Sequence, residues 1–201
     1  MNKQESLKII RNYIIKYLNN KKYKQILQWC KTPNVPYIIK NNKIVIKNKN
    51  KYNKIEKKWG NKMNGTYNKC MWSHKLGENI VKTFFERNNI KIWKPEKKNN
   101  YQPDFETNKY IIEVKTRNWT TTGTCGEKVL GVPYKYSDIP KLYNKKLKIV
   151  CVAYQEYELE HGNFKIFSKK LSDEKKKILK LWKNMGIEFV QFTSWINNGI
   201  T

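Results

Sequence analysis

Three charged residues in one short stretch have the types and the spacing that phosphodiester hydrolysis requires. Asp104 is followed nine residues later by Glu113, and Lys115 comes two positions after the glutamate. Carboxylate oxygens are ligands that Mg²⁺ prefers, and a nearby amine can orient a water molecule and balance charge on a phosphate. The stretch therefore predicts a magnesium-dependent hydrolytic site, provided that the fold brings the three side chains together.

These residues lie in a segment, residues 101–119, that is expected to form two short strands around a turn. The second strand is expected over residues 110–115, where apolar and charged residues alternate. Because side chains alternate between the two faces of a strand, Glu113 and Lys115 should share one face with Ile111. The other face should be apolar and belong to the core, through Tyr110, Ile112 and Val114.

The position of the turn decides whether the two carboxylates meet. A turn at Thr107–Asn108, where asparagine tolerates the backbone conformation, would place Asp104 opposite Ile111. Asp104 and Glu113 would then be diagonal neighbours, roughly 7–8 Å apart at the backbone. Both could reach one Mg²⁺, and the carbonyl oxygen of Val114 is expected to add a further ligand. A register shift of one residue would move Asp104 to the opposite face.

The composition points to a polyanionic partner. The 201 residues include 42 Lys and Arg against 16 Asp and Glu, which gives a formal net charge of +26. Such a charge suits DNA, RNA or an anionic membrane surface. With 39% hydrophobic and 13% aromatic residues, the chain should fold as one domain with at most a small appendage.

The sequence contains few of the residues that other classes of catalytic or metal-binding site require. The four cysteines form no Cys-x-x-Cys pair, which argues against a zinc site or a disulfide framework, and Cys151 should be a packing residue. The two histidines, His74 and His161, are far apart, which disfavours a histidine-metal nuclease or a Ser-His-Asp triad. Neither a signal peptide nor a membrane-spanning apolar run is evident, so we expect a soluble intracellular protein.

Residues 1–70 should form a unit of their own, ahead of the candidate site. The spacing of apolar residues predicts two helices within residues 1–30, interrupted at Asn19–Asn20. Two apolar runs around Asn41–Asn42 predict a β-hairpin. Residues 47–70 are strongly basic and suit either an arm that follows phosphates or a solvated loop. The helices and the hairpin either read DNA, as a winged-helix module does, or simply pack on the core.

After residue 70 the chain alternates between helical and strand patterns. Ser172 should cap a helix that Gly186 closes, with Ile178 and neighbouring apolar residues facing inward. The expected order is helix, strand, strand, strand, helix-like segment, strand, helix and strand, which indicates an α/β fold. The corresponding ranges are 73–88, 90–93, the hairpin within 101–119, a segment broken at Pro133 and Pro140, then 148–154, 172–186 and 187–192, and the inward side chains are Ile178, Leu179, Trp182 and Met185.

An aspartate followed by Glu-x-Lys on the next strand resembles the signature of the PD-(D/E)xK nuclease superfamily. Pro103, Asp104, Glu113 and Lys115 carry the resemblance, and the run GTCGEKVLGVPYKY, residues 123–136, is similar to a segment of small type II restriction endonucleases. The resemblance implies an αβββαβ core, a mixed central sheet flanked by helices. The nuclease core would occupy residues 71–201, and residues 1–70 would be a mainly helical extension.

The resemblance also implies further roles. Glu78, on the first core helix, would complete the metal site beside Asp104 and Glu113, and cleavage would leave 5′-phosphate ends. Residues after the catalytic strand could meet phosphates or base edges. The candidates for DNA contact are Arg117, Trp119, Thr122, Thr124, Lys128 and Lys135.

The function that fits these features best is a Mg²⁺-dependent, sequence-specific endonuclease of double-stranded DNA, acting as a homodimer without a small-molecule cofactor or a membrane. Two alternatives remain open from the sequence. One is a structure-specific or mismatch-specific DNA endonuclease, such as a junction resolvase or a repair nuclease. The other is a basic nucleic-acid-binding protein without catalytic activity.

Overall fold

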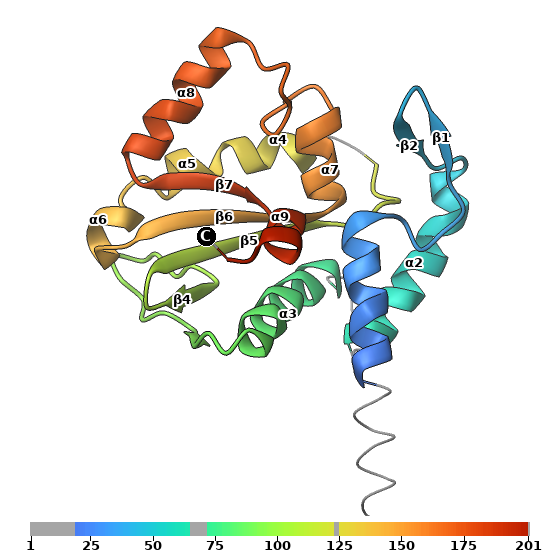
Figure 1. Cartoon of the computed structure of the whole chain (residues 1–201), viewed down its shortest axis with the longest axis horizontal. Coiled ribbons are helices and arrows are strands. Elements are labelled where there is room, and N and C mark those ends of the chain that lie inside the picture. The colour runs from blue at the N-terminus through green and yellow to red at the C-terminus, as the bar shows by residue number, and fades with distance from the viewer. Residues whose placement is uncertain (1–18, 65–71, 123–124, 201) are drawn as a thin grey trace, which may run out of the picture.

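The structure, a computed structural model, describes residues 19–64, 72–122 and 125–200. Its centre is a mixed five-stranded sheet in the order β3-β4-β5-β6-β7, flanked by helices on both faces (Figure 1). Strand β4 pairs antiparallel with both β3 and β5, whereas β6 pairs parallel with both β5 and β7. The strands are β3 (Ile92–Trp93), β4 (Phe105–Thr107), β5 (Tyr110–Arg117), β6 (Lys146–Ala153) and β7 (Ile187–Gln191).

Two apolar clusters hold the helices against the sheet, one on each face. Ile112 and Val114 of β5 face α3 and α9, whereas Ile111 of the same strand faces the helices of the opposite layer. This alternation confirms the expected mixed sheet between helical layers. The helices are α3 (Trp72–Arg87) and α9 (Phe192–Asn198) on one side, and α4 (Cys125–Leu130), α5 (Val132–Lys135), α6 (Ile139–Tyr143) and α7 (Tyr154–His161) on the other.

A close approach fixes α3 on the strand that carries the candidate site. An added Cβ at Gly77 would lie only 1.7 Å from Oγ1 of Thr116. Because only glycine leaves room there, α3 lies tightly against β5. This contact brings the next residue, Glu78, towards the end of the hairpin where the acidic residues gather.

The turn of the β4–β5 hairpin lies one residue later than the sequence predicts. Phe105 pairs with Ile112 and Glu106 with Ile111, so Asp104 does not lie opposite Ile111. The cause is Thr107, whose Oγ1 accepts the backbone N–H of Tyr110 at 2.9 Å and closes the turn around Asn108 and Lys109. The register therefore differs by two residues, which leaves every side chain on its expected face.

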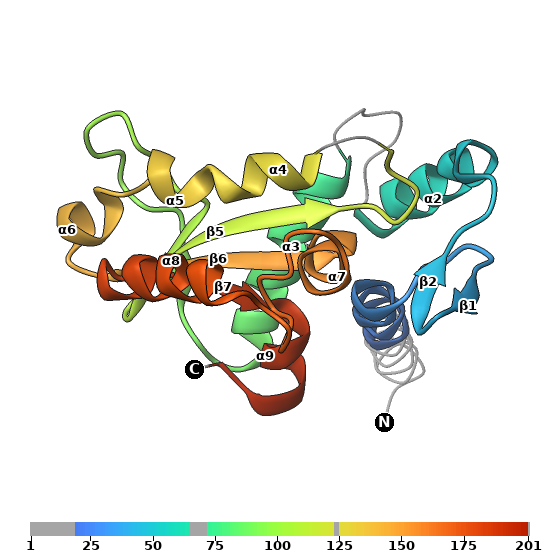
Figure 2. The ribbon, with the colours of Figure 1, turned by 90° about the horizontal axis from the view of Figure 1, so that it is seen from above.

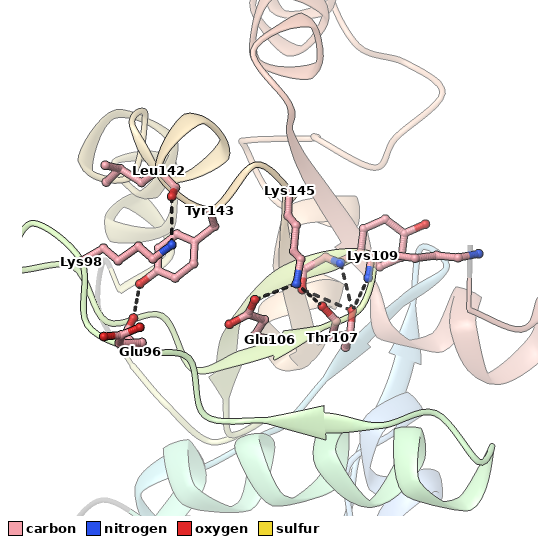
Figure 3. A network of polar contacts seen from close by, with 9 residues as sticks. Glu96, Lys98, Glu106, Thr107, Lys109, Leu142, Tyr143 and Lys145 are labelled. Atoms are coloured by element: carbon pink, nitrogen blue, oxygen red, sulfur yellow. Dashed lines mark hydrogen bonds and ion pairs between the residues drawn. The ribbon is translucent and has the colours of Figure 1, made fainter.

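A network at the turn end of this hairpin ties it to the segment before β6 (Figure 3). Nζ of Lys145 lies 2.7 Å from Oε1 of Glu106 and 2.8 Å from the carbonyl oxygen of Thr107. Nearby, the Tyr143 hydroxyl donates to the carbonyl oxygen of Glu96 at 2.5 Å. These bonds anchor the turn and thereby restrain the hairpin, whose opposite end carries Asp104 and Glu113.

The N-terminal unit combines the predicted hairpin with a helix that the sequence analysis missed. A helix covers residues 19–31 and includes Asn19 and Asn20, whereas the first of the two helices predicted within residues 1–30 lies outside the described residues. The hairpin around Asn41–Asn42 is confirmed. Residues 47–70, expected as an arm or a loop, contain α2 (Lys49–Asn64), which lies beside α3. The hairpin strands are β1 (Ile38–Lys40) and β2 (Lys43–Val45).

Helix α8 (Asp173–Asn184) has the predicted cap but not the predicted packing. The Ser172 hydroxyl accepts the N–H of Lys175 as expected, yet none of the residues of α8 is buried. Ile178 and Met185 were expected to face inward, but they are 47% and 43% exposed. The helix lies along the outside of edge strand β7, where only part of its apolar face finds a partner (Figure 1).

None of the helices in the described ranges has the length and apolar character that crossing a membrane requires.

Candidate active site

Asp104 immediately precedes β4, where the neighbouring strand β5 extends past the end of β4. Its Oδ2 accepts the backbone N–H of Val114 at 2.7 Å. The carboxylate therefore occupies the place that a backbone carbonyl of the neighbouring strand would take in a longer hairpin. This bond fixes Asp104 against the edge of β5, beside Glu113 and not diagonal to it.

Glu113 and Lys115 share one face of β5, as the alternation predicts. Nζ of Lys115 lies 2.7 Å from Oε1 of Glu113. The Glu113 side chain is only 7% exposed, whereas that of Lys115 is 30% exposed. The structure thus brings a buried carboxylate and a partly exposed ammonium group together as an ion pair.

Burial and neighbouring acids make Asp104 costly to ionise. Burial, the largest cause, and the Glu113 and Glu78 carboxylates together raise the pKa of this carboxyl group to about 6, against the lowering effects of the Val114 N–H and of Lys115. An aspartate that is costly to ionise within a group of acids is typical of sites that bind a cation or carry out proton chemistry.

Glu78 takes part in this electrostatic group without joining a compact cluster. Its carboxylate accepts a hydrogen bond from Lys75 at 3.1 Å and is 25% exposed. Within the described ranges, no set of three His, Cys, Asp or Glu side chains is arranged to hold a metal ion. The expected completion of the metal site by Glu78 therefore stays a prediction.

The donor set at the edge of β5 fits a hard divalent cation. In a β-strand the N–H and C=O of one residue point to the same side, so the Val114 carbonyl points to the edge where its N–H meets Asp104. Two carboxylates and a carbonyl oxygen are ligands suited to Mg²⁺. Burial, and then the negative charges of Glu113 and Glu78, raise the pKa of Asp104, and a bound cation would offset the cost of its ionisation.

Tyr136 is a member of the site that the sequence analysis did not single out. It is 6% exposed and hydrogen-bonds to the Glu113 side chain from the segment that follows α5. Burial and the nearby negative charges of Glu113 and Asp104 raise the pKa of its hydroxyl well above the ordinary value. A lone tyrosine far along the chain gives no local signal, because only the tertiary fold brings it to Glu113.

A groove of about 630 Å³ opens beside Lys115. Its walls come from the end of β5, the residues after it and the α4–α5 segment, and they include Lys128 and Lys135, both exposed. Figure 2 shows α4 and α5 running alongside β5. A basic groove that leads to the paired acid and amine is a suitable path for a phosphodiester chain.

Two of the residues predicted to contact DNA are buried in this structure, although Arg117 also lines the groove. Trp119 is 1% exposed, and its Nε1 donates to the carbonyl oxygen of Trp29 at 2.8 Å, so it belongs to the core. Arg117 is 5% exposed, and its Nη1 lies 2.5 Å from Oε2 of Glu158, which already compensates its charge. Both side chains therefore stabilise the end of β5.

The other residues predicted to contact DNA remain predictions. Thr122 is exposed just after the candidate strand, and Lys128 and Lys135 line the groove. Thr124 lies outside the described residues.

Glu56 of α2 is the second important residue that the sequence analysis missed. It is fully buried, and its Oε1 accepts Nε1–H of Trp29 at 2.8 Å and the N–H of Trp119 at 2.9 Å. Its Oε2 accepts the N–H and the hydroxyl of Thr120 at 2.9 and 2.7 Å. One carboxylate thus joins the N-terminal unit to the segment that leaves the candidate strand. The sequence signal that could have identified Glu56 is that it is the only acidic residue in a long lysine-rich segment.

We expect the substitution Asp104→Asn to stabilise the metal-free protein. The pKa rises from 3.8 in the unfolded chain to about 6 in the fold, so the folded state holds more protons between these values. The free energy of unfolding should therefore fall as pH rises through this window. Asparagine can still accept the Val114 N–H but carries no charge, and should raise the free energy of unfolding at pH 8 by about 3 kcal/mol.

Urea titrations at pH 4 and pH 8 without divalent ions measure this effect. Asp138→Asn, at an exposed position just before α6, is the matched control and should change neither value. A loss of stability in the Asp104 variant at pH 8 would contradict the prediction.

Comparisons with family models, with curated proteins and with solved structures find no match for this chain.

Proposed function

We propose that the protein is a Mg²⁺-dependent endonuclease that cleaves double-stranded DNA at specific sequences. The observation that carries this proposal is the meeting of Asp104, Glu113 and Lys115 at one edge of β5. There the Val114 N–H holds the Asp104 carboxylate, and the ammonium group of Lys115 lies 2.7 Å from Glu113. The groove with exposed lysines beside this edge supports a nucleic-acid substrate.

Each group has a distinct role in the proposed reaction. Asp104, Glu113 and the Val114 carbonyl would hold Mg²⁺, which when bound makes water more acidic and polarises phosphoryl oxygens. Lys115 would orient the attacking water and compensate the negative charge that grows on the phosphate. Tyr136 would keep the Glu113 carboxylate in position through its hydrogen bond. Cleavage in this manner would leave 5′-phosphate ends.

The topology supports the resemblance to PD-(D/E)xK nucleases. Helix α3 is followed by three antiparallel strands, the α4–α6 segment and then β6, which pairs in parallel with β5. This is the αβββαβ order that the resemblance implies. Since one fold can serve many activities, the topology supports the proposal only together with the site residues.

A homodimer would provide one active site for each strand of the duplex. Sequence specificity would come from side chains near the scissile bond. The candidates are Lys128 and Lys135, which line the groove, and Thr122, which is exposed after the candidate strand.

The test is digestion of a long DNA of known sequence with and without Mg²⁺. Discrete fragments that appear only with Mg²⁺ are expected, and sequencing their ends should report the target site and the 5′-phosphate. A continuous smear would indicate that the protein cleaves DNA without sequence specificity. Cleavage restricted to branched or mismatched DNA would identify a structure-specific nuclease, and intact DNA under all conditions would contradict nuclease activity.

A further inference from the structure

The surface of the N-terminal unit is free of exposed acidic side chains over residues 19–64. This range contains thirteen lysines and one acid, Glu56, which is 0% exposed and bonded within the core. No exposed carboxylate within residues 19–64 therefore balances this positive charge; the nearest acids lie outside this range, Glu127 and Glu158, which line a hollow with Lys43. A surface of this kind is complementary to a polyanion along its whole length.

The tip of the β1–β2 hairpin concentrates this charge. Lys40 pairs directly with Lys43 across the two strands, and the turn between them is formed by Asn41 and Asn42, both with positive φ, at 49° and 57°. The paired φ values identify a tight hairpin turn that suits asparagine. Like charges at directly opposed positions destabilise a hairpin, so a bound anion would relieve this repulsion.

The same tip exposes apolar surface. Ile39, adjacent to Lys40, is 70% exposed, and Ile38 is 42% exposed. Ile44, which pairs with Ile39, instead packs against the core, and its N–H donates to the Tyr157 hydroxyl at 2.5 Å. The hairpin is thus anchored at β2 and projects an isoleucine beside its two lysines.

Strand β2 of the hairpin lines a separate hollow, which is next to the candidate groove along α4. Lys43 and Val45 line a hollow of about 400 Å³ together with Gly126 and Glu127 at the start of α4. Lys128, the next residue of α4, lines the groove that leads to Lys115. Figures 1 and 2 both show the hairpin projecting from the side of the molecule near the end of β5.

We infer that the β1–β2 hairpin is a second DNA-contacting element, which binds the duplex beyond the cleaved bond through phosphate contacts of Lys40 and Lys43 and apolar contact of Ile39 with a groove. The inference rests on DNA as the substrate of the proposed function, but not on cleavage itself. Apolar side chains flanked by lysine and asparagine are suited to the sugar and base edges of a DNA groove.

The test measures binding to duplex DNA without divalent ions, over a range of salt concentrations. In the double variant Lys40→Gln/Lys43→Gln, the slope of log affinity against log salt should become shallower by about 1.8, because each lost phosphate contact removes about 0.9. Ile39→Ser should weaken binding about tenfold and leave the slope unchanged, since it removes apolar contact only. Both effects should disappear on a short duplex of about 10 base pairs, one helical turn.

Matched controls come from α8, which Figure 1 places on the opposite side of the molecule. Lys177→Gln/Lys180→Gln removes two exposed lysines, and Leu181→Ser removes an apolar side chain that is 58% exposed. Both controls should leave the slope and the affinity as in the unmodified protein. An equal loss in the controls would show that only net charge or general apolarity matters, which overturns the inference.

Two further outcomes separate this inference from the proposed function. If Ile39→Ser changes the sedimentation of the free protein and not its DNA affinity, the hairpin is a protein contact and the inference fails. If the hairpin variants lose affinity as expected but the protein never cleaves DNA, the inference stands and the nuclease proposal fails. Normal cleavage and binding by the hairpin variants on long duplexes would give the reverse result.

Discussion

Replacing Lys115 with alanine should slow DNA cleavage by about 10²–10³-fold and leave DNA affinity almost unchanged. Lys115 is the cation whose Nζ lies 2.7 Å from Glu113, and its 30% exposure leaves it open to the groove. A group that meets charge as it develops on the phosphate acts mainly in the transition state, so its loss should lower turnover and not binding. Single-turnover cleavage and equilibrium binding on the same duplex separate the two effects.

Lys109→Ala is the matched control for this prediction. Lys109 is an exposed lysine in the turn of the same hairpin (Figure 3), at the other end of the hairpin from Asp104 and Glu113. The control removes the same charge from the same hairpin, and cleavage should remain within about twofold of normal, as for an ordinary surface substitution. Comparable losses in both variants would mean that Lys115 contributes only net charge, and undiminished cleavage in Lys115→Ala would remove it from the catalytic site.

Replacing Glu56 with alanine should lower the free energy of unfolding by about 4 kcal/mol. Its two oxygens accept four hydrogen bonds from Trp29, Trp119 and Thr120, and the site is fully buried. Truncation leaves several donors without an acceptor, and each buried donor left unpaired costs about 1–3 kcal/mol. Chemical denaturation followed by far-ultraviolet circular dichroism measures the change.

Glu56→Gln refines the same test because it keeps the shape of the side chain. Its single oxygen can still accept two of the bonds, so we expect a smaller loss of about 2 kcal/mol. Glu86→Ala is the surface control, since Glu86 is exposed and only 3.8 Å from Lys82 in a helical ion pair, which typically contributes about 0.3–0.5 kcal/mol. A loss below about 1 kcal/mol in Glu56→Ala would show that the four bonds do not stabilise the fold.

Together the two residues show how the site depends on the rest of the chain. Lys115 and Glu113 meet because they are two positions apart on one strand. The segment after that strand is held by Glu56, which belongs to a helix more than fifty residues earlier. The N-terminal unit is thus part of the support for the candidate active site, as well as a basic surface of its own.

Local sequence patterns were sufficient where neighbours along the chain decide the structure. Alternation placed Glu113 and Lys115 on one face of β5, and paired asparagines marked the turn at Asn41–Asn42. The turn of the β4–β5 hairpin lies one residue later than the asparagine pattern predicts, because the Thr107 side chain accepts the N–H of Tyr110 and closes the turn. That difference left Asp104 on the correct face only because the register changed by two residues.

Patterns failed where burial depends on contacts between distant segments. Apolar spacing in α8 predicted an inward face, but the helix lies at the edge of the sheet, with too little surface opposite it to bury Ile178 or Met185. Trp119 follows the candidate strand and looked available to DNA, yet the helix over residues 19–31 covers it. The many lysines of α2 leave no clear apolar periodicity in its sequence. The helix is stabilised instead by the packing of a narrow buried face around Glu56.

The sequence by itself determined the α/β alternation, the positive charge and the acid–amine pair on one strand, since periodicity, composition and short spacing are properties of the chain alone. The tertiary structure decided the rest of the site. It placed Asp104 on the Val114 N–H, brought Tyr136 to Glu113 and buried Glu56 between two segments. These contacts join residues far apart in the chain, and only the packing of helices on both faces of the sheet brings them within hydrogen-bonding distance.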